Sequence, residues 1–236
     1  MENYAQFTER INSFEKPVIY LGEGDFSLNP RVYDKFDENN RFRQFYGDTT
    51  VFDLTKDIKD RLNSLVDILY DKAGECFAER VKTSTFHITL HDLSNSCELA
   101  EIGEDVFRNE LKLLKFVHSQ KISRCTINFE TNYIINMVGT SLVLAVKPKS
   151  KEDYDKLMQL YSIVDCVKAL PYQLTPHITL AYYNVKGFGE ESSKKLCEAV
   201  NELNKESFDI TVSSDTLYYE KFTDMNSYHR IFSFTE

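Results

Sequence analysis

The chain is 236 residues long, with 42% hydrophobic and 28% charged residues and a formal net charge of −9 at pH 7. This composition is typical of a soluble globular protein, and the length allows a sizeable core. The acidic balance argues against binding of duplex DNA, which needs a basic surface, but not against a small nucleotide or an RNA end held in a local pocket. No apolar run is long enough to span a membrane and no secretory signal is present, so we expect a cytoplasmic protein without a membrane partner. The five cysteines contain no Cys-x-x-Cys pair, which predicts reduced thiols and no zinc site.

Residues 1–46 have the least regular pattern, and we expect them to form an N-terminal extension that folds over the rest of the chain. A short helix is predicted around residues 8–14 and a strand over residues 18–21. Residues 22–40 are rich in Gly, Asn, Asp and Pro, which indicates a loop. The remaining residues, 47–236, are predicted to form the main domain.

Strands and helices alternate along the main domain. Thr55 is the expected N-cap of its first helix, and Gly74 is the expected stop. Apolar residues at helical spacing predict helices over residues 55–72, 105–118, 149–167 and 190–203. Short apolar or alternating segments predict strands over residues 49–54, 85–91, 125–137, 141–147, 177–183, 208–212, 217–222 and 229–234.

The most informative feature is the tetrapeptide His-Ile-Thr-Leu, which occurs at residues 87–90 and again, ninety positions later, at residues 177–180. Its β-branched residues and apolar surroundings predict a strand in each copy. Side chains at i and i+2 of a strand share a face, so each copy presents an imidazole and a hydroxyl on one face and two aliphatic side chains on the other. Two copies that face each other would form a site of two acid/base groups and two hydroxyl donors.

The repeat also organises the main domain. Residues 49–136 and 141–234 form two similar halves, each with one copy near its middle. This similarity suggests an old duplication.

With these two motifs the chain resembles the 2H phosphoesterases, whose signature is a pair of His-x-Thr or His-x-Ser motifs, each followed by an apolar residue. The family includes RNA 2′-5′ ligase-like proteins and cyclic nucleotide phosphodiesterases. The resemblance covers about residues 47–234. It implies an α+β fold of two pseudo-symmetric lobes of antiparallel sheet, with helices on the outer faces, that enclose a central cleft. We therefore expect residues 47–236 to form a bilobal domain, whereas the resemblance implies nothing about residues 1–46.

Cleavage of a phosphodiester needs a base for the attacking oxygen, an acid for the leaving oxygen and donors for the charged non-bridging oxygens. Histidine titrates near neutrality, so His87 and His177 can act as general acid and base, while Thr89 and Thr179 can bind the phosphate. We expect a metal-independent phosphodiesterase that needs no cofactor. The resemblance implies that its substrate carries a 2′,3′-cyclic or 2′-5′ linkage, in a small nucleotide or an RNA end. The residues do not decide which histidine is the acid.

Two other functions stay open at this point. The same groups working in reverse would join RNA ends, so one alternative is an RNA ligase or end-processing enzyme. The other is a nucleotide-binding module without turnover, although both motifs are intact, which argues against a decayed site. The sequence does not fix the oligomeric state.

Two further residues of the motif strands are candidates for substrate binding. Tyr183 is expected on the motif face of its strand, where it would stack on a nucleotide base, whereas Tyr182 is expected on the opposite face. His91 lies four residues after His87 on the same predicted face and would line the cleft, although a structural role is the simpler interpretation. A zinc site made of these two histidines is a weak hypothesis, because four-residue spacing suits a helix and not a strand.

Overall fold

The fold is described here from a computed structural model, over residues 2–15, 28–120 and 122–235. The strand predicted at residues 18–21 and the first part of the loop predicted over residues 22–40 lie outside these ranges.

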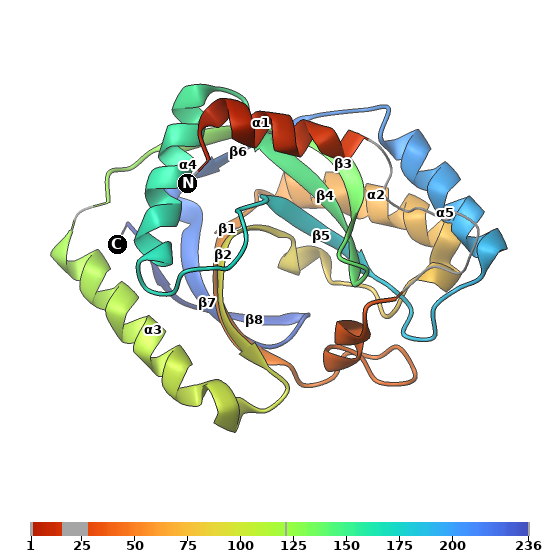
Figure 1. The fold of residues 1–236 in the computed structure, drawn as a ribbon, viewed down its shortest axis with the longest axis horizontal. Helices are drawn as coiled ribbons and strands as arrows, with labels where there is room; N and C mark the ends of the chain where they lie inside the picture. The colour runs from red at the N-terminus through yellow and green to blue at the C-terminus, as the bar shows by residue number, and fades with distance from the viewer. Residues whose placement is uncertain (1, 16–27, 121, 236) are drawn as a thin grey trace.

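Two antiparallel four-stranded sheets form the centre of this described part of the chain (Figure 1). Their strands are β1 (Tyr46–Asp53), β2 (His87–Ser96), β3 (Thr126–Met137), β4 (Ser141–Pro148), β5 (His177–Tyr182), β6 (Asp209–Ser213), β7 (Leu217–Asp224) and β8 (Ser227–Ser233). The first sheet has the strand order β2-β1-β7-β8, and the second has the order β5-β4-β3-β6.

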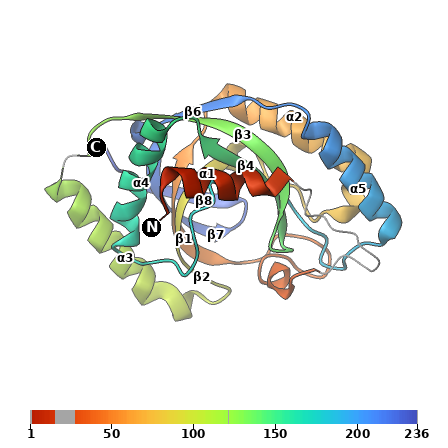
Figure 2. The ribbon, with the colours of Figure 1, turned by 45° about the horizontal axis from the view of Figure 1, so that its top comes forward.

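The helices lie around the outside of the sheets (Figures 1 and 2): α1 (Tyr4–Asn12), α2 (Lys56–Ala73), α3 (Leu99–Ser119), α4 (Lys151–Asp165) and α5 (Glu190–Leu203). Helix α3 packs on β1 and β2, α4 packs on β3 and β4, and α2 packs on α5 and β5. The prediction of an α+β fold, with antiparallel sheets and helices on their outer faces, is confirmed. In the parts of the chain described above, no helix has the length and apolar character to cross a membrane.

Helix α2 illustrates how closely a local pattern can predict an element. It begins directly after Thr55, which has the extended backbone of an N-cap but makes no capping hydrogen bond with its side chain, and Gly74 is its C-cap. One stripe of residues at helical spacing is buried: Leu62, Val66, Leu69 and Ala73. The helix therefore begins directly after its predicted N-cap and ends one residue beyond the predicted residue 72.

Both copies of the repeat bury their aliphatic face. Ile88, Leu90, Ile178 and Leu180 are fully buried and belong to the main hydrophobic core. Burial of each such side chain contributes roughly 1.5–3 kcal/mol to folding. The burial also decides which face of each strand carries the histidine and the threonine, because side chains alternate along a strand.

The two halves of the sequence do not each form one sheet. Strand β3, at the end of the first half, pairs with β4 and β6 in the second sheet, and β7 and β8 return to the first sheet beside β1. The halves expected over residues 49–136 and 141–234 thus exchange strands. Hydrophobic alternation identifies a strand but not its partner. Each sheet still carries one copy of the repeat on an edge strand, β2 or β5.

Gly47 lies where β1 closely approaches its neighbours. A Cβ at this position would lie 2.3 Å from the Phe222 ring and 2.3 Å from the Ser94 carbonyl oxygen. We expect Gly47→Ala to lower the free energy of unfolding by about 1–3 kcal/mol, because the sheet must shift to accept the methyl group.

Gly103→Ala is the matched control, since its added Cβ meets nothing within 4 Å in helix α3. This variant should gain roughly 0.5–1 kcal/mol from the helix preference of alanine. Urea unfolding of both variants beside the wild type measures the two effects. A Gly47→Ala variant as stable as the wild type would contradict the close approach.

Candidate active site

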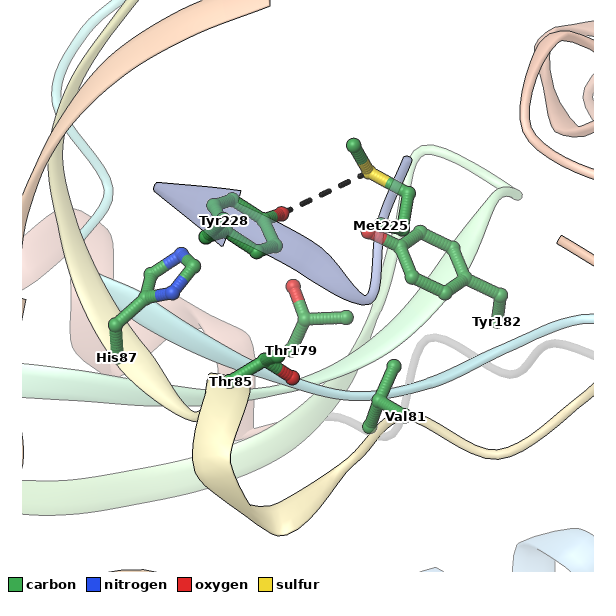
Figure 3. A pocket seen from close by; sticks show the side chains of 7 residues that line it. All are labelled: Val81, Thr85, His87, Thr179, Tyr182, Met225 and Tyr228. Carbon is green, nitrogen blue, oxygen red and sulfur yellow. Dashed lines mark hydrogen bonds between the residues drawn. The ribbon is translucent and has the colours of Figure 1, made fainter. Parts of the chain in front are cut away.

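The two strands that carry the repeat, β2 and β5, are edge strands of their sheets and lie against each other. A small pocket lies at this junction (Figure 3), lined by Val81, Thr85, His87, Thr179, Tyr182, Met225 and Tyr228. Its volume of about 20 Å³ is enough for roughly one water molecule. The pocket brings together His87 from the first copy of the repeat and Thr179 from the second.

The other two motif residues, Thr89 and His177, are half-buried and do not line this pocket. His177 nevertheless lies close enough to His87 for its charge to lower the pKa of the His87 imidazole. The two histidines therefore belong to one electrostatic unit, although they come from different sheets.

The backbone two residues before each histidine acts on its ring. His177 Nδ1 donates to the Thr175 carbonyl oxygen at 2.7 Å, and the Thr85 backbone favours the protonated form of His87. Because a carbonyl only accepts, Nδ1 of His177 carries the proton and Nε2 is left for proton exchange with a ligand. The sequence repeat extends to Thr-x-His-Ile-Thr-Leu, which is two residues longer than the tetrapeptide.

Burial keeps both imidazoles neutral at pH 7. Desolvation lowers the pKa of His87 to about 4, and the nearby His177 adds to this shift. Desolvation also lowers the pKa of His177, with a further contribution from the Lys35 ammonium, whereas the Thr175 carbonyl and the Asp92 carboxylate oppose the shift. A proton on either ring would be costly unless an anion lies beside it.

A β-bulge in β2 changes the position of His91. Thr50 lies opposite His91 and Val51 lies opposite Thr89, so Leu90 is an extra residue in β2. An extra residue reverses which side chains share a face beyond it. The expectation that His91 shares the motif face is therefore wrong.

His91 is instead fully buried beneath that face. Its ring lies 4.9 Å from the Tyr161 ring, its Nε2 is 3.3 Å from Asp165 Oδ1, and its Nδ1 contacts the Asp92 carbonyl. These contacts give His91 a structural role, and it does not line the pocket. Over the described residues, no group of three or more His, Cys, Asp or Glu side chains is arranged to hold a metal ion.

A second bulge, at the same position of the repeat, changes the roles of the two tyrosines. Leu142 lies opposite Ala181 and Val143 lies opposite Thr179, so Leu180 is the extra residue in β5.

As a result Tyr182, not Tyr183, lines the pocket beside Thr179. Tyr183 is fully buried, with ring centroids 6.3 Å from Phe77 and 5.8 Å from Phe188. The expected faces of the two tyrosines are therefore reversed, and the structure does not place Tyr183 where a base could stack on it.

Another wall of the pocket comes from β8 and the turn before it, a part of the chain that sequence reasoning missed. Tyr228, at the start of β8, places its ring 5.1 Å from the His87 ring, edge to face (Figure 3). Its hydroxyl lies 3.8 Å from the sulfur of Met225, in the turn between β7 and β8. No local pattern marks these residues, because they reach the pocket only through the return of β7 and β8 to the first sheet.

Asp92 was also missed, and the bulge explains why it matters. Asp92 is exposed and occupies in β2 the position that Tyr182 occupies in β5, three residues after the threonine. Its carboxylate favours the protonated forms of both His87 and His177. The hydroxyl of Tyr172 donates to it at 3.3 Å.

Comparisons with known proteins bear on the fold. No protein-family model and no curated protein matches the sequence. Among solved structures, the chain is similar to ATU0111, a conserved protein of unknown function from Agrobacterium tumefaciens. The identity is 16% and the TM-score 0.69, over 92% of this chain and 97% of that one.

Two more solved structures have a lower similarity. E. coli LigT complexed with 3′-AMP is 15% identical, with a TM-score of 0.46 over 82% of this chain and 100% of that one. TT0787 of Thermus thermophilus is 13% identical, with a TM-score of 0.48 over 80% of this chain and 97% of that one. At these identities structural similarity speaks for the fold and not for the activity. The Agrobacterium structure shows that nearly the whole fold described above occurs in another protein.

Proposed function

We propose that this protein is a 2H-type phosphodiesterase that uses His87 and His177 as its general base and general acid. The observation that carries the proposal is the meeting of two Thr-x-His-Ile-Thr-Leu strands at one junction, where the charge of His177 acts on the His87 ring. A single histidine in a sheet is commonly structural. Two matched histidines that influence each other's protonation are arranged for acid/base work.

The chemistry fits a 2′,3′-cyclic phosphate of a small nucleotide or an RNA end. One histidine would remove a proton from water as the water oxygen attacks phosphorus. The other would donate a proton to the ribose oxygen as its bond to phosphorus breaks. Thr89 and Thr179 would donate hydrogen bonds to the non-bridging oxygens, which supplies charge stabilisation without a metal ion.

We assign His87 as the base. A pKa of about 4 keeps this imidazole neutral at pH 7, which is the form that accepts a proton. His177 would then be the acid, and it must gain its proton in the complex. The phosphate anion supports this, since an adjacent negative charge raises the pKa of an imidazole.

Entry of a substrate requires a side-chain movement. The pocket has room for roughly one water molecule, which is less than a phosphate group needs. Tyr228 and Met225 form its wall on the side of the β7–β8 turn. We propose that these two side chains move aside to admit the phosphate.

The first test is hydrolysis of a panel of 2′,3′-cyclic nucleotides and 2′-5′ oligonucleotides in EDTA. We expect His87→Ala and His177→Ala each to lower kcat by at least about 10²-fold, because each variant removes a proton-transfer group. His118→Ala is the control, since His118 is exposed at the end of helix α3. Activity that survives both motif substitutions would refute the assignment. Binding of the panel without any turnover would point to a nucleotide-binding module.

The second test is the pH dependence of kcat/KM. The proposal requires one neutral and one protonated histidine, so the profile should be bell-shaped. The value of kcat/KM should rise through about pH 4, as His87 loses its proton. With increasing pH it should then decrease, and the midpoint of this decrease should lie below 6.5, the ordinary pKa of histidine, since the pKa of His177 is also lowered. The two apparent pKa values of the profile belong to the pair of rings and not to either ring alone. A rate that changes in only one direction between pH 3 and 9 would contradict the mechanism.

A further inference from the structure

The segment that precedes β1 is fixed against the end of β5. Phe36 is fully buried, with its ring 5.3 Å from that of Tyr182. On one side of it, the Tyr33 hydroxyl donates to the Val185 carbonyl at 2.8 Å. On the other side, Asn40 Oδ1 accepts from the Val185 backbone N–H at 2.8 Å. The chain between these anchors therefore has a defined position beside the pocket.

Lys35 extends from this segment to the rings of Tyr182 and Phe45. Its Nζ lies 5.0 Å from the centroid of the Tyr182 ring and 5.6 Å from that of Phe45. Tyr182 also lines the pocket, together with His87 and Thr179. The same side chain therefore lies next to both the Lys35 ammonium and the pocket. The positive charge of Lys35 also reaches His177, whose protonation it opposes.

Lys35 has no ion-pair partner among the described residues, unlike two other cations near the site. Lys59 lies 2.6 Å from Asp53, and Arg230 lies 2.6 Å from the same carboxylate. For Lys35 no carboxylate oxygen of the described residues lies within 4.0 Å of Nζ.

The charges around Lys35 act from farther away. The carboxylates of Asp92 and Asp34 favour its charged form, and the guanidinium of Arg31 disfavours it. Burial is the largest effect and lowers the pKa of the Lys35 ammonium. An incoming anion would offset that cost.

A cation at this site would stabilise an incoming phosphodiester. The phosphodiester carries a negative charge, whereas in the free protein both histidines are neutral at pH 7 and the threonines are uncharged. A charge that is moved out of water into a partly buried site is costly unless an opposite charge lies nearby. Lysine binds phosphate as a point charge and does not need the fixed geometry of a guanidinium group.

We propose that Lys35 is the phosphate-binding cation of this site, supplied by the segment before β1 to the anionic phosphate held between the two motifs. The inference rests on the proposed function and adds a residue to it. The proposal also gives the segment before β1 a role in substrate binding. A substrate must present its phosphate on the Tyr182 side of the pocket. The competing interpretation is that Lys35 only packs its stem on Tyr182 and Phe45.

Three variants separate the two interpretations. Lys35→Met keeps the apolar stem and removes the charge, and Lys35→Arg keeps the charge. Lys186→Met is the control, since Lys186 is an exposed lysine just beyond β5 and its substitution makes the same change in net charge. Thermal unfolding of each variant reports whether packing has changed.

The kinetic readout uses the best substrate of the cyclic nucleotide panel. We expect Lys35→Met to lower kcat/KM by about 10–100-fold, the effect of one charge-assisted hydrogen bond, mainly through a higher KM. Lys35→Arg should recover most of this loss, and Lys186→Met should match the wild type. If Lys35→Met hydrolyses the substrate as well as the wild type, the role of Lys35 is refuted and the phosphodiesterase assignment stands.

A second readout does not depend on turnover. Binding of inorganic phosphate is followed by the NMR signals of the histidine rings. We expect phosphate to bind the wild type and Lys186→Met alike, and to bind Lys35→Met about tenfold more weakly. If Lys35→Met binds phosphate more weakly but no panel member is hydrolysed, Lys35 is supported as an anion-binding residue and the proposed reaction is refuted. No phosphate binding by the wild type, together with no turnover, would overturn both proposals.

Discussion

The site depends on the buried aliphatic faces of the two edge strands that carry the repeat. Ile88, Leu90 and their counterparts at 178 and 180 lie in the core, which prevents a register shift that would turn the histidines away. The core thus stabilises the fold and, through the same side chains, places the proposed acid/base pair. A hydrogen bond from Nδ1 to the Thr175 carbonyl then orients the His177 ring.

The bulges at Leu90 and Leu180 lie at the same position of the two repeats. Each ends the alternation of its strand after the threonine and presents the third following residue to the site. That residue is Asp92 in one strand and Tyr182 in the other. The two halves therefore share the histidine and the threonine but differ in what surrounds them. The carboxylate acts on both imidazoles, whereas the tyrosine ring lies 5.0 Å from the Lys35 ammonium. We infer that this difference is what separates the roles of the two histidines.

The sequence predicted the elements and the motif pair well, because both follow from local patterns. The stripe of helix α2 and the buried faces of the repeats are set by the spacing of apolar residues. The same logic failed for Tyr183 and His91, because a bulge adds one residue without changing the apolar pattern. It could not find Tyr228 or Lys35, since their positions depend on strand pairing and on a segment of irregular sequence. The threonine two residues before each histidine is the one missed signal that was visible in the sequence. A comparison of the two repeats beyond the tetrapeptide would have found it.

The most direct test of this account is the tautomeric state of the two histidines, measured by ¹⁵N NMR of the rings at pH 7 with assignment through His87→Gln and His177→Gln. The account predicts that both rings are neutral and that His177 carries its proton on Nδ1, so that Nε2 is its basic nitrogen. A proton on Nε2 of His177, or either ring already charged at pH 7, would contradict the arrangement on which the proposed mechanism is built.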